Sequence, residues 1–504
     1  VIVFRVAFET RIMTQSKLIK NVGKQFAIYG LGDLLNKAVA FLLLPFYTHY
    51  LRPQEYGTLE ILDLTVYLVS MFLTLGMNHA VIRFYHREES EDGRKAVVSA
   101  GVLATFIVSL VALIPLLVFS PSISGWLLKS PESARLFALV FIAMVFNMTG
   151  EVAMTYFRLR EMPGWFVSFS TTRLILNLSG NILFLAFLGK GVEGILWAGL
   201  IASTLVNGVL LGYLTRHVGV GFSWAVFLPM LRYGAPLMGS GIGMYLINFG
   251  DRFALQRLMS LGDVGIYSLA YKFGMLPNVL ILTPFQMLWG PKQFQISHEP
   301  DAPNTFSRVF NYFWFLQMFL GLGLCVLIGD VIRIIAAGDY GNAAAYVPPL
   351  VLSYICYGAY WYFQFGVMHA RKTSSLAVNT LVMAGLNLAL NFLLIPRMGI
   401  WGACLATFIS IFLMMVVVHF LSRSYYVIPF AYGKMVAMFI LALALYALAG
   451  RINPANIAAS VAVRTLIALC YPLLLLLFRV TRGSDLEFLQ GFRERFFRVI
   501  FLRK

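Results

Sequence analysis

The sequence predicts an all-α polytopic membrane protein with about 14 transmembrane helices: two six-helix lobes related by an internal repeat, followed by two C-terminal helices. Hydrophobic residues make up 60% of the chain and charged residues 12%, whereas an ordinary soluble domain carries about 25% charged residues. Apolar runs recur roughly every 35 residues, which is barely one membrane span plus a turn. This spacing leaves no room for a sizeable soluble domain.

Each span is expected where an apolar run of about 20 residues lies between polar flanks. The predicted spans lie near residues 24–50, 57–80, 96–119, 134–157, 164–188, 192–215, 233–256, 264–290, 309–329, 344–368, 374–395, 399–421, 428–449 and 455–478. They divide the chain into a cytoplasmic tail (1–23), an N-lobe (24–220), a C-lobe (221–424), an appended pair of spans (425–479) and a basic amphipathic cytoplasmic tail (480–504). We expect Met13 to be the true start, because the residues before it blend poorly with the rest of the chain.

Positive charge is distributed unevenly about the predicted membrane. The chain has 39 Lys and Arg residues, 22 Asp and Glu residues and a formal net charge of +17. About 26 of the 39 lie on the side of the two termini and about nine on the opposite side, and cytoplasmic flanks retain positive charge. Both termini are therefore predicted to be cytoplasmic, and the charge excess does not indicate nucleic-acid binding. The four cysteines lie in apolar runs without a His or Cys cluster, so no metal site is expected.

An internal repeat relates the two predicted lobes. Asn177 and Asn181 fall on Asn387 and Asn391, and Gly191-Val192-Glu193-Gly194 falls on Gly399-Ile400-Trp401-Gly402. A similar offset places Glu55-Tyr56-Gly57 on Asp263-Val264-Gly265, and Arg160 on Arg371. Halves with an even number of spans run parallel, and transporters built in this way hold their substrate between the halves.

The first and seventh spans occupy equivalent positions in the repeat, and both are rich in Gly and Pro. The residues concerned are Gly30, Gly32 and Pro45 in one span, and Gly234, Pro236, Gly239, Gly241 and Gly243 in the other. Matched interruptions of this kind predict a binding site. Close helix packing through small residues, as Gly239-x-x-x-Gly243 permits, is the alternative interpretation.

Several motifs resemble those of a known family. They are Leu51-x-Pro53-x-Glu55-Tyr56-Gly57, Asp251-Arg252-x-x-Leu255 and Gly265-Ile266-Tyr267-x-x-Ala270-Tyr271-Lys272. With the repeat, they resemble the polysaccharide exporters called O-antigen or exopolysaccharide flippases. These exporters share the multidrug/oligosaccharidyl-lipid/polysaccharide exporter superfamily with multidrug antiporters and lipid II flippases.

The resemblance implies a transport function and no enzyme activity. It implies that an undecaprenyl-pyrophosphate-linked oligosaccharide moves from the cytoplasmic to the periplasmic leaflet of the bacterial inner membrane, by alternating access and with coupling to an ion gradient. The implied partners are that lipid-linked oligosaccharide, the bilayer and other polysaccharide assembly proteins. No cofactor is expected apart from a coupling ion, H⁺ or Na⁺.

Ionisable residues within spans are costly to insert and usually face a partner or a wet cavity. The candidate substrate-binding cations are Lys37, Arg173, Arg252, Lys272 and Arg464. A charged headgroup that crosses a low-dielectric region needs fixed donors in place of its hydration, which Arg and Lys supply. The alternatives are that Lys37 pairs with Asp33 one turn before it and that Arg252, beside Asp251, reaches the interface.

Carboxylates within spans are candidates for ion coupling. They are Asp33, Asp63, Glu151 and Asp251. A partly dehydrated carboxylate can titrate near neutral pH or ligate Na⁺. Static pairing with Lys37 or Arg173 is the alternative interpretation of these acids.

Two other classes of function compete with the flippase. A membrane-embedded glycosyltransferase, polymerase or acyltransferase needs a catalytic cluster, and the sequence contains neither a phosphate-binding loop nor paired carboxylates in one loop, so no catalytic residue is assigned. A multidrug or cation antiporter, or a lipid II flippase, of the same superfamily is the closer alternative. The two appended spans and the excess of intramembrane cations favour an anionic lipid-linked substrate.

Overall fold

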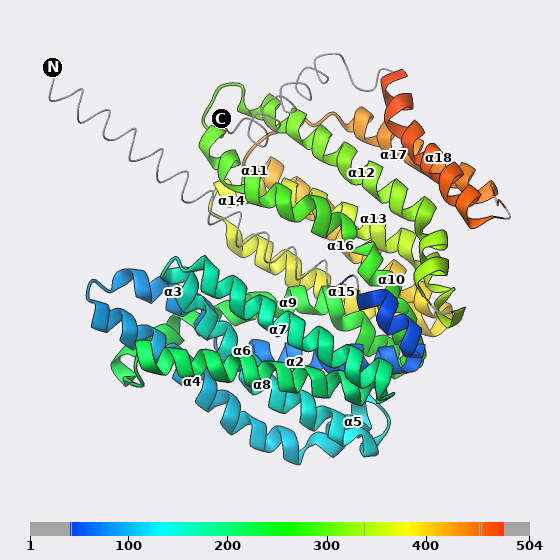
Figure 1. The fold of residues 1–504 in the computed structure, drawn as a ribbon. Coiled ribbons are helices and arrows are strands. Elements are labelled where there is room, and N and C mark those ends of the chain that lie inside the picture. Colours follow the sequence, from blue (N-terminus) through cyan, green and yellow to red (C-terminus); the bar gives the residue numbers. More distant parts are fainter. Residues whose placement is uncertain (1–40, 42, 337, 453, 455, 478–504) are drawn as a thin grey trace, which may run out of the picture. The chain divides into compact units, whose positions relative to one another are not determined.

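The computed structural model describes residues 41, 43–336, 338–452, 454 and 456–477, and every regular element within them is a helix (Figure 1). Packing divides the chain into two compact units, the first ending at Gly265 and the second beginning at Ile266. The first unit holds α2 (Pro53–Leu73), α3 (Met77–Arg87), α4 (Glu91–Val118), α5 (Ser120–Leu127), η1 (Pro131–Ser133), α6 (Ala134–Leu159), α7 (Pro163–Asn181), η2 (Ile182–Phe187), α8 (Gly191–His217) and α9 (Trp224–Leu258).

The second unit takes up most of α10, which begins in the first unit. Its helices are α10 (Leu261–Gly274), η3 (Asn278–Leu282), α11 (Thr283–Ile296), α12 (Ala302–Ile335), η4 (Gly338–Tyr340), α13 (Ala343–Phe363), α14 (Phe365–His369), α15 (Thr373–Met398), α16 (Ile400–Arg423), α17 (Tyr432–Arg451) and α18 (Ile457–Leu477). The units are defined by packing: α9 lies in the first because it packs on α2, α3 and α4. The lobe boundaries predicted from the repeat stay a prediction.

The predicted fold class is confirmed. In the part of the chain that the structure describes, ten helical stretches are long and apolar enough to cross a membrane. Each predicted span from residue 57 onward coincides with one to three helices, whereas the first predicted span lies mostly outside the described residues. Helices α7, α9 and α13 are also at least 19 residues long but are not among these ten. The protein is a multi-pass membrane protein.

The internal repeat is visible in local geometry within each unit. On α7 the Asn181 amide donates to Asn177 Oδ1 at 2.7 Å, and on α15 the Asn391 amide donates to Asn387 Oδ1 at 3.0 Å. The glycines at the starts of the two partner helices also match: Gly191, the first residue of α8, has φ 54°, and Gly399, immediately before α16, has φ 58°. These two parts of the overlay are therefore confirmed.

One position of the overlay is wrong by a single residue. Before α7, Met162 N–H donates to the Phe157 carbonyl at 2.8 Å, and before α15, Lys372 N–H donates to the Val367 carbonyl at 3.0 Å. The residue preceding each donor has a left-handed backbone: φ is 54° at Glu161 and 57° at Arg371. Arg371 therefore corresponds to Glu161 and not to Arg160. The backbone geometry of the two turns, and not the presence of a basic residue in each, fixes this register.

The predicted interruption of the seventh span is also wrong. Helix α9 runs unbroken through Gly234 and Pro236. Gly234 instead packs where α2 gives way to α3, so that a Cβ at Gly234 would lie 2.4 Å from the Leu75 carbonyl oxygen. The structure thus matches the alternative, close packing through small residues. The glycines of the first span, Gly30 and Gly32, lie outside the described residues.

Candidate functional site

A polar cavity lies inside the first unit, among α2, α3, α6, α7 and α8. It has two adjoining compartments of about 250 Å³ and 670 Å³. Three residues line both compartments and form the boundary between them: Glu151, Ser170 and Arg173. We name the smaller the Arg158 compartment and the larger the Asp63 compartment, each after the charged residue that lines it alone.

Helical spacing explains why these side chains converge. Helix α6 contributes Asn147, Glu151, Met154 and Arg158, and helix α7 contributes Phe166, Ser170, Arg173 and Asn177. Within each set, successive residues are three or four positions apart, which places them on one face of their helix. Helix α8 adds Ser203 and Asn207 in the same way, whereas Asp63 comes from α2 and Asn78 from α3.

The two charges at the boundary lie deep in the membrane-spanning bundle. Arg173 is about 15 Å along α7 from Pro163, and Glu151 is about 12 Å from the adjoining end of α6, at 1.5 Å per residue. The hydrocarbon core of a bilayer is about 30 Å thick. Both charges are therefore near its middle, whereas Arg158 lies almost at the end of α6.

These two charges are not locked to each other. Among the described residues, neither the Glu151 carboxylate nor the Arg173 guanidinium forms a side-chain hydrogen bond or an ion pair, and both side chains are exposed within the cavity. The static pair that was the alternative interpretation is absent between these two residues, and each remains available to a ligand.

Buried amides complete the lining of the Arg158 compartment. Asn207 is 2% exposed, yet its Nδ2 atom has no hydrogen-bond partner in the described structure, and neither has Asn78 Oδ1. Asn207 is held closely against α6, because a Cβ at Gly150 would lie 2.2 Å from Asn207 Oδ1. An unpartnered buried amide is costly, so these atoms are suited to a polar ligand.

Sequence reasoning missed Asn78, Asn207 and Arg158. The charge distribution assigns Arg158 to the cytoplasmic flank, although it lies two helical turns after Glu151 and therefore on the same face of α6. That spacing could have indicated its role. The two amides carry no charge and stand in separate helices, so no sequence signal joins them.

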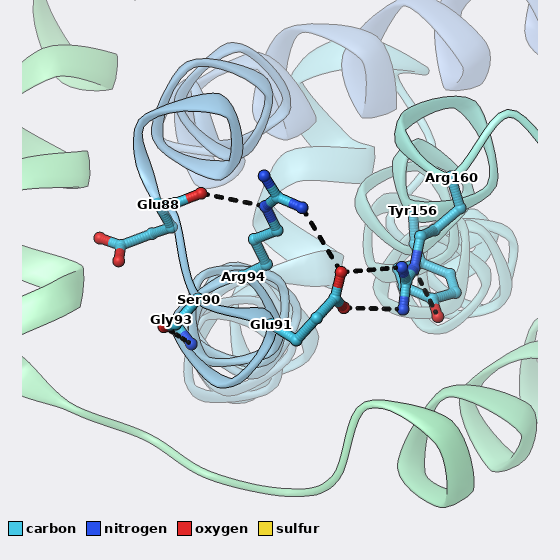
Figure 2. Close-up of polar contacts among 7 residues, drawn as sticks. All are labelled: Glu88, Ser90, Glu91, Gly93, Arg94, Tyr156 and Arg160. Carbon is cyan, nitrogen blue, oxygen red and sulfur yellow. Dashed lines mark hydrogen bonds and ion pairs between the residues drawn. The ribbon is translucent and has the colours of Figure 1, made fainter.

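A charged network braces the end of the bundle next to Arg158. Figure 2 shows the Glu91 carboxylate between Arg94 and Arg160, with Arg160 Nη2 at 3.0 Å and Arg94 Nη1 at 3.4 Å. Arg94 Nε also donates to the Glu88 carbonyl at 3.0 Å. These contacts tie the start of α4 to the turn that follows α6.

The remaining predicted site residues lie apart from the described lining of this cavity. Arg252 and Asp251 on α9 are buried and paired with each other, with Arg252 Nη1 at 2.8 Å from Asp251 Oδ1. Lys272 is partly buried on α10 in the second unit. Lys37 and Asp33 lie outside the described residues.

Arg464 lies in the second unit, in a buried charge cluster. Its Nη1 atom is 2.8 Å from Asp330 Oδ2, and the Ser460 hydroxyl donates to both oxygens of the same carboxylate at 2.9 and 3.0 Å. Asp330 is fully buried on α12, and Arg464 is 14% exposed on α18. The contact joins the appended helix to the rest of this unit.

A chain of many apolar helices around a polar intramembrane cavity defines the class of helical membrane proteins to which transporters belong. A sequence model of the family described as polysaccharide biosynthesis protein matches residues 22–297, more than half of the chain. The chain therefore belongs to the polysaccharide biosynthesis protein family, and the predicted resemblance is confirmed.

Individual relatives are more distant. The succinoglycan biosynthesis transport protein ExoT of Rhizobium meliloti is 26% identical over 264 residues, which are 52% of this chain and 51% of that protein. An uncharacterized membrane protein of Methanocaldococcus jannaschii is 22% identical over 443 residues, 79% of this chain and 83% of that protein. The match to the succinoglycan protein thus spans about half of its length.

Two solved structures share the fold. The lipid II flippase MurJ in an inward closed conformation superposes with a TM-score of 0.69 at 15% identity, over 90% of this chain and 99% of that chain. An inward-facing multidrug resistance MATE family transporter of the MOP superfamily superposes with a TM-score of 0.60 at 14% identity, over 77% and 94%. The three proteins described above whose names state an activity are the succinoglycan transport protein, the lipid II flippase and the multidrug transporter. All three are named as transport proteins and not as enzymes.

Proposed function

We propose that this protein is a flippase that moves an undecaprenyl-pyrophosphate-linked oligosaccharide, an O-antigen or exopolysaccharide repeat unit, from the cytoplasmic to the periplasmic leaflet. In this proposal the protein lies in the bacterial inner membrane with both termini in the cytoplasm. It works by alternating access, coupled to an H⁺ or Na⁺ gradient, together with other polysaccharide assembly proteins. Membership of the polysaccharide biosynthesis protein family supports the substrate class.

The observation that carries the proposal is the Arg173 guanidinium. It lies in a membrane-embedded cavity, near mid-depth, without a partner among the described residues. An unpaired cation at this depth is costly unless it serves a ligand or a wet path. A guanidinium can bind two oxygens of a phosphate at once, which fits the pyrophosphate of the lipid-linked substrate.

A second candidate function has one observation in its favour. The Asp63 compartment is the larger of the two, and its described lining contains two acids, Asp63 and Glu151, and one cation, Arg173. A cavity with an excess of carboxylates suits a cationic compound, as a multidrug or cation antiporter would need. Under this alternative, Arg173 would restrain the acids and would not bind substrate.

Depletion of the protein in its native host tests the flippase directly. Cells should accumulate lipid-linked oligosaccharide in the cytoplasmic leaflet and lose surface polysaccharide, and wild-type protein should restore both. Arg173→Ala, present in the membrane at the wild-type level, should fail to restore them, and the Arg173→Ala/Lys272→Ala double variant should fail likewise. Normal surface polysaccharide without accumulation after depletion would rule the flippase out, and altered drug sensitivity alone would favour the antiporter.

A further inference from the structure

A break in the second predicted span lies beside the Arg158 compartment. Helices α2 and α3 belong to one apolar stretch, Pro53–Arg87, that is long enough to cross a membrane, but the helix is interrupted just before Met77. The two residues before Met77 are left-handed, with φ 52° at Leu75 and 66° at Gly76. Met77 is about 15 Å along α3 from Arg87, at 1.5 Å per residue, so α3 begins inside the bilayer.

Neighbouring backbone holds this break in place. Gly76 packs so closely against α9 that a Cβ at Gly76 would lie 2.4 Å from the Gly234 carbonyl oxygen. Leu75 has a Cβ and is therefore strained in a left-handed conformation, which persists where the surrounding packing imposes it. Strained backbone of this kind clusters at functional sites, and interrupted helices in transporters mark substrate sites.

The amino-terminal end of α3 has an unused hydrogen-bond donor. Among the described residues, no side chain caps α3 at Gly76, and no acceptor binds the Asn78 N–H group. Asn78 is the second residue of α3 and lines the Arg158 compartment. The N–H groups and the dipole at a helix N-terminus attract anions. In transporters, the N-termini of interrupted helices face anionic groups of the substrate.

A second, independent feature points to the same ligand. Asn207 of α8 is 2% exposed and lines this compartment, and its Nδ2 atom donates to no described residue. Arg158 of α6 lines it too, and its guanidinium is held by the Thr155 hydroxyl at 3.1 Å and lies 5.9 Å from the centre of the Phe166 ring. Donors from three helices therefore meet in one compartment, and guanidinium and amide N–H groups are the donors that phosphate oxygens accept from.

These donors are separate from Arg173. Arg158, Asn207 and Asn78 line the smaller compartment alone, whereas Arg173 stands at the boundary and lines both. Glu151, the one acid in the described lining of the smaller compartment, is also at the boundary, about 10 Å along α6 from Arg158. A phosphate held by Arg158 and Asn207 would thus lie away from this carboxylate.

We propose that the Arg158 compartment is a second phosphate subsite: Arg158, the Asn207 amide and the amino-terminal end of α3 bind one phosphate of a diphosphate headgroup, and Arg173 binds the other. This inference rests on the proposed function, because it takes the lipid-linked diphosphate as the ligand. It adds selectivity, since a headgroup with a single phosphate fills only one of the two subsites.

Full-length protein in lipid nanodiscs allows the test, with geranyl pyrophosphate and geranyl monophosphate as probes. Calorimetry is the readout, and empty nanodiscs correct for partition into the lipid. Wild type should bind the pyrophosphate about 10-fold or more tightly than the monophosphate, because the second phosphate gains hydrogen bonds that involve charged groups. Inorganic pyrophosphate should bind more weakly, since the bilayer retains a prenyl chain beside the cavity. Equal affinities for inorganic and geranyl pyrophosphate would overturn the assignment to a lipid headgroup.

Two variants test the subsite itself. Asn207→Asp keeps the shape of the side chain but replaces its donor with a carboxylate oxygen, so it should weaken pyrophosphate binding by about 10-fold or more and change monophosphate binding little. Asn304→Asp, the same change at an exposed position outside the cavity, should behave as wild type. Arg158→Gln should also reduce the preference for pyrophosphate, and Arg158 is exposed near the end of α6, so its replacement leaves the packed core intact.

Arg173→Gln separates this inference from the proposed function, because it should weaken the binding of both probes. If Arg173→Gln does so while Asn207→Asp and Arg158→Gln keep the wild-type preference for pyrophosphate, the second subsite is refuted and the flippase stands. If Arg173→Gln binds both probes and exports normally, the proposed function itself fails.

Discussion

Each unit contains the same pair of packed helices, α7 with α8 in the first unit and α15 with α16 in the second. The two pairs differ in whether their equivalent residues line a polar cavity or are buried. On α7, Asn177 lines the cavity beside Arg173, whereas on α15 the matching Asn387 is buried, 1% exposed. The turn geometry places Met383, 8% exposed, at the position of Arg173. The helical scaffold is therefore repeated in the second unit, but the charged residue at the position of Arg173 is not.

The same contrast holds at the other two charged positions of the cavity. The repeat places buried Tyr271 at the position of Asp63 and Trp361 at that of Glu151. The second unit has a buried charge pair elsewhere, between Asp330 on α12 and Arg464 on α18, and α18 lies outside the repeat. The comparison teaches that the paired asparagines of α7 and α15 belong to the repeated scaffold, whereas the ionisable residues of the cavity are particular to the first unit, as the proposed function requires.

The largest effect is expected when Arg173 of the first unit is replaced by methionine, the residue at the equivalent position of the second unit. Arg173→Met should reduce export of lipid-linked oligosaccharide by at least about 30-fold, because loss of a charge-pairing group costs about 2–5 kcal/mol. Arg173→Lys should retain part of the activity, since it keeps the charge but not the fork. Export is measured in depleted cells at matched membrane abundance, with Arg216→Met as the control. Full export by Arg173→Met would contradict the proposal that the charge at this position of the first unit is needed for function.

The next effect concerns the charge pair of the second unit. Asp330→Ala should lower the free energy of unfolding by about 3–5 kcal/mol, because it leaves Arg464 buried without its partner. The double variant Asp330→Leu/Arg464→Met should recover most of this loss. Thermal unfolding in detergent measures both.

The exposed ion pair Asp301–Arg308 is the matched control for that experiment. Its shortest N–O distance is 3.6 Å and both side chains are 64% exposed, so Asp301→Ala should cost less than about 1 kcal/mol. Equal losses in the two single variants would show that Asp330 does not hold α18 against α12.

A smaller effect separates two glycines that the repeat matches, Gly194 and Gly402. A Cβ at Gly402 would lie 2.5 Å from the Leu394 carbonyl, whereas at Gly194 the closest atoms are side-chain carbons of Phe184 and Lys190 at 2.8 Å. Because the clash at Gly402 is the closer of the two and falls on the backbone itself, Gly402→Ala should cost about 1–3 kcal/mol of stability, and Gly194→Ala should cost less. Thermal unfolding of the two variants, with Gly208→Ala as an open-space control, checks the order. The reverse order would contradict the geometry.

The smallest effect is expected at the braced end of the first unit. Glu91 is 51% exposed, so Glu91→Gln should lower stability by less than about 1 kcal/mol, and by less still at high salt. Unfolding at low and high ionic strength measures it. A large loss that is independent of salt would mean that this network supports the cavity more strongly than its exposure implies.

Much of the candidate site was predictable from sequence, because a charge inside an apolar run is visible without a structure. Asp63, Glu151 and Arg173 were found in this way, and they line one cavity. Arg252 and Arg464 satisfied the same criterion but are paired with Asp251 and Asp330. Hydropathy reports that a charge is buried, and it cannot distinguish a charge that faces a cavity from one that faces a partner.

Composition and periodicity by themselves determined the helical membrane fold, the spans and the repeat, since the bilayer requires every spanning backbone to satisfy its own hydrogen bonds. The register of the turns, the continuity of α9 and the packing of Gly234 depended on contacts between segments far apart in the chain. Only the tertiary structure placed Glu151 and Arg173 at the boundary of two compartments without joining them. A sequence states which charges must be accommodated, but three-dimensional packing decides which of them are left free for a ligand.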